Sequence, residues 1–64
     1  MNLPIGMILT NTKKIKFCIV GRTMYKKKCT DISIRRIPDG KEYEYDVDTI
    51  VDRIKSGDVI LSHE

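Results

Sequence analysis

The sequence contains no tryptophan, one histidine and two cysteines among its 64 residues. Two cysteines, Cys18 and Cys29, are too few for the disulfide framework that stabilises many small secreted domains, so we predict that both thiols are reduced. No apolar run approaches the roughly 18 residues that cross a membrane, and the start lacks the charged and then apolar regions of a signal peptide. These absences predict a cytoplasmic protein.

Enzyme chemistry has little support in the residues present. The single histidine, His63, is the penultimate residue, where chains usually fray, so it is poorly placed to activate a nucleophile. The carboxylates of Glu42, Glu44 and Asp46 alternate along one predicted strand. That pattern favours a solvent-facing surface that protects a sheet edge over an acid and base pair. We therefore predict a protein that is not an enzyme.

Metal and phosphate sites also lack their usual patterns. Cys18, Cys29 and His63 do not form the close ligand pairs of a structural zinc site. The aspartates around residue 48 lack the glycine and the bidentate glutamate of a calcium loop. The four glycines are isolated from one another, so there is no glycine-rich phosphate loop. The sequence predicts neither a metal nor a cofactor.

Aliphatic and charged residues make up most of the chain, with 41% apolar and 33% charged positions. At this length the chain is near the lower limit for independent folding, so residues 1–64 are expected to form a single domain with one compact core. Isoleucine, valine, leucine and methionine must supply that core because aromatic residues are few. Such a mixture favours a sheet-rich fold.

Charge is separated along the chain. Residues 13–36 carry nine bases and one acid, whereas residues 39–64 carry three bases and eight acids, for a net charge of +3. A separated field of this kind steers an anionic partner towards one surface, and it also permits head-to-tail self-association. Strand pairing would neutralise part of the separation, through pairs such as Arg35 with Glu44.

Alternating apolar and polar residues predict five short strands, with one helix before the last. The strands are expected at residues 7–10, 15–22, 29–37, 41–47 and 58–62. In the second strand, Ile19 should share a face with Phe17, while Cys18 and Arg22 share the other, because successive side chains point to opposite faces. In the fourth strand the residues expected to point inward are Tyr43, Tyr45 and Val47.

The polar residues 23–28 predict a hairpin tip, and a hairpin symmetric about that tip places Cys18 opposite Cys29. The expected helix covers residues 49–56, with Asp48 as its N-cap and Gly57 as its stop. Its side towards the core is expected to carry Ile50, Val51 and Ile54.

The Pro-Asp-Gly segment at residues 38–40 predicts a second hairpin, for which two registers are open. A two-residue Asp-Gly turn pairs Ile34 with Tyr45 and keeps every apolar side chain on one face. A type I turn with a glycine bulge instead sets Ile34 opposite Glu44. Because a slip of one residue exchanges the two faces, the first register is favoured unless a second bulge at residues 35–36 restores the pattern.

This order of four strands, a short helix and a closing strand, with an Asp-Gly hairpin before the helix, resembles that of small SH3-like β-barrels. The resemblance covers nearly the whole chain. It implies a mainly β, five-stranded antiparallel barrel with one short helix before the last strand. An OB-like barrel is the alternative, but its helix would be expected between the third and fourth strands, where residues 38–40 leave no room.

Three segments resemble the compact, lysine- and isoleucine-rich proteins encoded by phages and prophages of AT-rich bacteria. They are G-M-I-L-T-N at residues 6–11, P-D-G-K-E-Y-E at residues 38–44 and I-x-x-G-x-V at residues 54–59. The resemblance implies an accessory or host-directed role inside a bacterial cell and carries over no catalytic residues.

The basic residues remain as candidates for binding. We expect them to dock the protein on a bacterial protein or nucleoprotein complex, as an accessory protein or inhibitor. The alternative is a nucleic acid or anionic nucleotide bound by the same face, because arginine and lysine beside a tyrosine contact phosphates and stack on a base. Exposed strand edges would also allow a partner or a second copy to add a strand. The predicted binding residues are Arg22, Tyr25, Lys26, Lys27, Lys28, Arg35 and Arg36.

Overall fold

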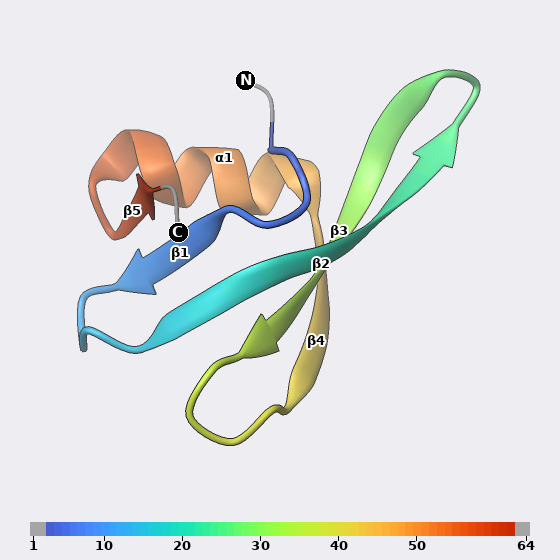
Figure 1. The fold of residues 1–64 in the computed structure, drawn as a ribbon. Helices are drawn as coiled ribbons and strands as arrows, with labels where there is room; N and C mark the ends of the chain where they lie inside the picture. Colours follow the sequence, from blue (N-terminus) through green and yellow to red (C-terminus); the bar gives the residue numbers. More distant parts are fainter. Residues whose placement is uncertain (1–2, 63–64) are drawn as a thin grey trace.

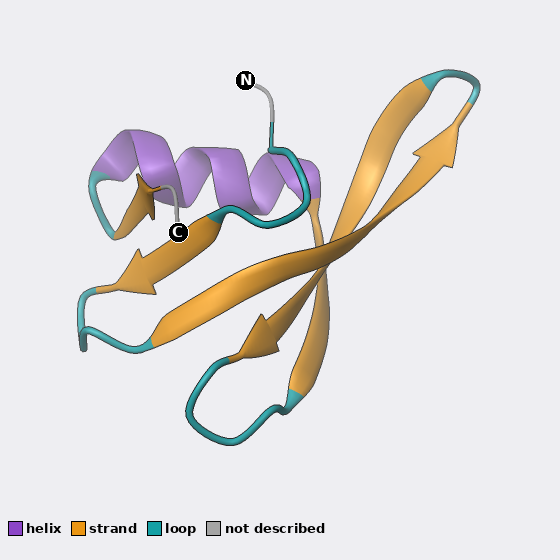
Figure 2. Ribbon diagram, viewed as in Figure 1, coloured by secondary structure: helices purple, strands orange, loops and turns teal. Residues whose placement is uncertain are grey.

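A computed structural model describes residues 3–62 as one antiparallel sheet of five strands packed against one helix (Figure 1, Figure 2). In chain order the elements are β1 (Ile8–Asn11), β2 (Lys16–Tyr25), β3 (Lys28–Arg36), β4 (Glu42–Asp46), α1 (Val47–Ser56) and β5 (Val59–Ser62). The order across the sheet is β4-β3-β2-β1-β5. The predicted fold class, a mainly β protein with a short helix before the last strand, is confirmed.

The last strand of the chain, β5, pairs with the first strand, β1. This pairing places Leu61 opposite Leu9. β4 and β5 nevertheless remain terminal strands, and no ladder joins them within residues 3–62. α1 contacts β3, β4 and β5, so a helix covers the opening that strand pairing leaves (Figure 1). No helix in this described part of the chain is long and apolar enough to cross a membrane.

The core is aliphatic, as the composition predicts. Ile19 on β2 and Ile32 on β3 are fully buried, and α1 contributes Ile50. The segment before β1 is held against β2, because the Ile19 N–H donates to the Met7 carbonyl at 3.0 Å and the Ile19 carbonyl accepts from the Gly6 N–H at 2.8 Å. The buried cluster comprises Leu3, Met7, Leu9, Ile19, Ile32, Ile34 and Ile50.

The β2–β3 ladder contains a bulge that changes which face β2 presents. Just after Ile19, β2 carries one extra residue, Val20, that has no partner on β3. An extra residue exchanges the faces of the strand. Arg22 therefore pairs with Ile32 and lies on the same sheet face as that core residue, not on the face of Cys18. The predicted alternation of this strand holds as far as Ile19 and is wrong beyond it.

The β2–β3 hairpin turns at residues 26–27, within the predicted tip of residues 23–28 but not at its centre. Cys18 consequently pairs with Arg35, and its predicted position opposite Cys29 is wrong. The polar residues before the turn do not end the strands: Met24 and Tyr25 still pair with Cys29 and Lys28, although a second register shift leaves Thr30 without a partner. Both cysteine thiols are free, as predicted.

The β3–β4 hairpin adopts neither predicted register. Ile34 pairs with Tyr43, not with Tyr45 or Glu44, and residues 37–40 form the loop. Relative to the favoured prediction the pairing is shifted by two residues, which leaves each side chain on its predicted face. The β4 tyrosines therefore share the face of the core isoleucine, although Tyr45, on a terminal strand, is 42% exposed.

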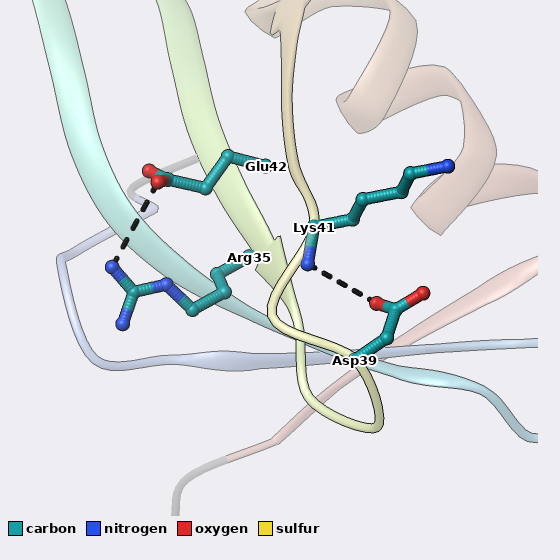
Figure 3. Close-up of polar contacts among 4 residues, drawn as sticks. All are labelled: Arg35, Asp39, Lys41 and Glu42. Atoms are coloured by element: carbon teal, nitrogen blue, oxygen red, sulfur yellow. Dashed lines mark hydrogen bonds and ion pairs between the residues drawn. The ribbon is translucent and has the colours of Figure 1, made fainter.

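Hydrogen bonds in the loop explain its length. The Arg36 N–H donates to the Lys41 carbonyl, and the Gly40 N–H donates to the Arg36 carbonyl, both at 2.7 Å. Gly40 has a φ of 73°, which glycine adopts without the steric cost of a side chain. The Asp39 carboxylate also accepts from the Lys41 N–H at 3.1 Å (Figure 3). These contacts close a four-residue loop instead of a two-residue turn.

α1 begins two residues earlier than predicted, so Val47 is its first residue and not the end of a strand. The N-cap is Asp46 instead of Asp48, because the Asp46 carboxylate accepts from the Thr49 N–H at 3.3 Å and from the Thr49 hydroxyl at 2.6 Å. The side-chain hydrogen bond from Thr49 is the main cause that lowers the pKa of Asp46. The predicted stop at Gly57 is confirmed, with a φ of 87°.

Substituting the N-cap tests this assignment. Asp46→Ala should lower the melting temperature by a few degrees, because the first helical turn loses a hydrogen-bond acceptor. Asp48→Ala removes the same charge from the first turn without removing the cap, so it should have a smaller effect. Circular dichroism melts of the two variants measure the difference. Equal losses would contradict the assignment of the cap to Asp46.

The cap also predicts a pH dependence. A lowered pKa in the folded state means that the contribution of ionised Asp46 is fully present above the pKa of an unfolded aspartate, about 3.9. It is lost as the pH falls through the lower folded pKa. The stability difference between the wild type and Asp46→Ala should therefore be constant near neutral pH and shrink below about pH 4. Urea denaturation across this range measures it, and a difference that does not shrink in acid would contradict the prediction.

Candidate partner-binding surface

The structure separates the predicted binding residues into two groups. We define the basic tip as the group at the turn of the β2–β3 hairpin: Arg22, Tyr25, Lys26, Lys27 and Lys28. Arg35 and Arg36 lie at the other end of β3. At about 3.3 Å per strand residue, the distance along β3 from Lys28 to Arg36 is roughly 26 Å. The seven residues therefore do not form one continuous face.

The basic tip projects from the body of the protein (Figure 1). The last paired residues before the turn are Tyr25 and Lys28, well beyond the buried core. Tyr25 is 64% exposed and the adjacent Met24 is 55% exposed. Met24 is not among the predicted binding residues, although a large apolar residue inside a polar hairpin tip is a signal that identifies it.

The turn of the basic tip holds two lysines in an unfavourable backbone conformation. Lys26 has a φ of 50° and Lys27 a φ of 65°. A two-residue hairpin turn with positive φ at both positions is a type I′ turn, which strongly favours asparagine and glycine. A side chain such as lysine costs roughly 1 kcal/mol or more in this region. The chain therefore carries charge at this turn at a cost to its stability.

A cation–π contact orders one side of the tip. The Lys26 ammonium lies 5.5 Å from the centre of the Tyr25 ring. A cation within about 6 Å of a ring face is attracted by the electrons of the ring. The exposed tyrosine and the lysine next to it thus present an apolar surface and a positive charge together.

The two remaining arginines lie beside carboxylates. A terminal guanidinium nitrogen of Arg35 is 3.9 Å from Glu42, with both side chains more than half exposed (Figure 3), so this pair contributes less than about 1 kcal/mol. The Arg36 Nε is 3.5 Å from an Asp39 oxygen. The expected pair of Arg35 with Glu44 is wrong because of the two-residue register shift. Within residues 3–62 these are the only ion pairs, and no lysine or arginine of the basic tip takes part in one.

The described residues show no metal centre. No group of three histidine, cysteine, aspartate or glutamate side chains within residues 3–62 is arranged to hold a metal ion. The carboxylates of Glu42, Glu44 and Asp46 are exposed, as predicted. His63 lies outside the described residues.

Comparisons with known proteins assign no relationship. No protein-family model matches the chain, and no curated protein and no solved structure is significantly similar to it.

Relieving the strained turn should stabilise the protein. Lys26→Asn combined with Lys27→Gly places the preferred residues in the type I′ turn and should raise the free energy of unfolding by about 1 to 2 kcal/mol. The matched control, Lys26→Gln with Lys27→Gln, removes the same charges but keeps side chains that are strained there. Urea denaturation compares the two. If the control gains as much stability, charge repulsion and not backbone strain limits the turn.

Proposed function

We propose that this protein is a non-enzymatic binding module that docks through the basic tip on an acidic surface of a bacterial protein or nucleoprotein complex. It acts in the bacterial cytoplasm as an accessory protein or inhibitor of the kind that phages and prophages encode. One observation carries the proposal: the β2–β3 hairpin extends beyond the core and presents strained lysines beside an exposed methionine and tyrosine.

The length of the hairpin supports a role for the tip outside the fold. Strand residues from Arg22 to Lys28 are exposed, whereas the fully buried residues of this hairpin lie nearer its base. No residue from Arg22 to Lys28 belongs to the buried cluster. Unfavourable backbone conformations persist where the surrounding structure holds them, and they are concentrated at functional sites.

The chemistry of the tip fits a protein surface. Interfaces combine large apolar anchors with a charged rim, and aromatic residues and methionine are enriched at them. Met24 and Tyr25 provide the apolar area, while the lysines and Arg22 provide positive charge around it. Such a tip fits an acidic groove that contains an apolar pocket. Arg35 and Arg36 contribute less in this proposal because each lies beside a carboxylate.

Nucleic acid is the second candidate, favoured by a specific observation. Tyr25 is the exposed ring within the basic tip, and a lysine ammonium already lies against it. Single-strand binders combine such rings with cations that contact phosphates. One ring stacks on one base, so this mode would give weak affinity that depends mainly on charge.

Charge reversal tests the protein-binding proposal. Replacing Lys26, Lys27 and Lys28 with glutamate should slow association with the partner by about tenfold or more and reverse its salt dependence. The matched control replaces three exposed lysines outside the tip, Lys13, Lys16 and Lys55, with glutamate. The readout is the amount of partner captured from bacterial lysate by the immobilised protein, followed by association rates with the purified partner.

The stabilised turn variant sharpens this test. Lys26→Asn with Lys27→Gly should fold more stably and yet capture less partner, so a loss of capture does not reflect unfolding. Unchanged capture by the charge-reversal variant, or an equal loss in the control, would overturn the assignment of the basic tip as the binding surface.

Fluorescence anisotropy with labelled single-stranded DNA and RNA tests the second candidate. If nucleic acid is the ligand, binding should be measurable at about 50 mM salt and fall steeply as salt rises. Tyr25→Ala should weaken it by about fivefold or more, the loss expected for one stacked base. No binding at low salt would remove this candidate. Nuclease treatment of the lysate in the capture experiment separates a protein partner from one that is held through nucleic acid.

A further inference from the structure

A cavity of about 170 Å³ lies between α1 and the sheet, beside the opening that β4 and β5 leave. Its walls come from all five strands and the helix, and their apolar side chains are Leu9, Phe17, Ile34, Tyr45, Ile50 and Val59. Sites for small molecules usually have about 300 to 1,000 Å³. A space of this smaller size suits a single side chain inserted by a partner.

Stacked aromatic rings form one side of the cavity. Tyr45 lines it and remains 42% exposed. The Tyr45 ring stacks on Tyr43 at 6.4 Å, and Tyr43 meets Phe17 edge to face at 6.2 Å. Rings held by their neighbours lose little freedom when a ligand binds. This wall is therefore ready to receive an apolar or aromatic group.

Two polar side chains at the cavity already make hydrogen bonds within the fold. The Thr49 hydroxyl donates to Asp46, and the Asn11 side-chain oxygen accepts from two backbone N–H groups of the β1–β2 turn at 3.0 Å each. The donors left over are the Asn11 amide nitrogen and the Arg53 guanidinium, which makes no ion pair with any residue between 3 and 62. Among residues 3–62, no carboxylate lines the cavity. The polar side of the cavity therefore favours an anionic group.

We propose that this cavity is a second binding site, separate from the basic tip, for one apolar or aromatic side chain of an extended peptide that has a carboxylate next to it. The apolar group enters between Tyr45 and Ile50, and the carboxylate meets Arg53. β5 (Val59–Ser62) borders the cavity through Val59, has a free backbone edge and carries no charged side chain. β4 carries carboxylates that repel an acidic segment. The peptide thus adds to the β5 edge.

Charge complementarity is tested with two probes that differ only in one group. They are N-acetyl-phenylalanine, with a free carboxylate, and its uncharged N-methylamide. Each is titrated into the ¹⁵N-labelled protein while backbone amide shifts are followed. Both should cause saturable shifts at Leu9, Ile50 and Val59, and the carboxylate form should bind about fivefold tighter, as expected for a charge-assisted hydrogen bond.

Arg53→Gln should remove the preference for the carboxylate form over the methylamide. The matched control, Lys55→Gln, removes the same charge from the last turn of α1 at a residue that does not line the cavity. It should keep the preference. Replacing Lys26, Lys27 and Lys28 with glutamate should leave probe binding intact, which distinguishes this site from the basic tip.

Three results would overturn the proposal. Absence of saturable shifts at the cavity would show that it takes no side chain. Equal affinity for the two probes would show that Arg53 does not select a carboxylate. Shifts at the same residues that depend on protein concentration without any probe would show that a second copy of the chain occupies the cavity.

Discussion

The rest of the structure depends on β2, which pairs with β1 on one side and β3 on the other, and whose Ile19 side chain is fully buried in the core. The extra residue at Val20 bends this strand, and the strand then continues with β3 past the core. One half of β2 therefore holds the sheet together, and the other half carries the basic tip. A straight strand of the same length would have placed Arg22 on the opposite face.

The separation of charge along the sequence becomes local when the strands pair. Pairing β3 with β4 brings Arg35 beside Glu42, and the loop between them brings Arg36 beside Asp39. These contacts are weak, but they partly neutralise the two arginines at the end of β3 that is far from the basic tip. The lysines of the basic tip, at the other end of β3, make no ion pair with any residue between 3 and 62. The large opposite charges of the two halves of the chain are therefore a poor guide to the surface that a partner meets.

Both candidate sites lie at places that the core does not fill: the end of the long β2–β3 hairpin and the gap between β4 and β5. The hairpin is longer than the buried cluster needs, so its end is free to contact a partner. Within residues 3–62 no ladder closes the sheet between β4 and β5, and an apolar cavity stays open beside the helix. In a domain this small the buried core has few residues, and both candidate binding surfaces lie at the edges and ends outside it.

The sequence by itself determined the number and order of the strands, the aliphatic core and the glycine that stops the helix. These follow from local alternation and from φ values that only certain residues adopt easily. It also indicated the lysines of the tip. The tertiary structure decided the bulge at Val20, the loop at residues 37–40, the N-cap at Asp46 and the cavity. Each depends on how distant segments satisfy one another's hydrogen bonds and packing, and alternation along one strand carries no information about its partner's register.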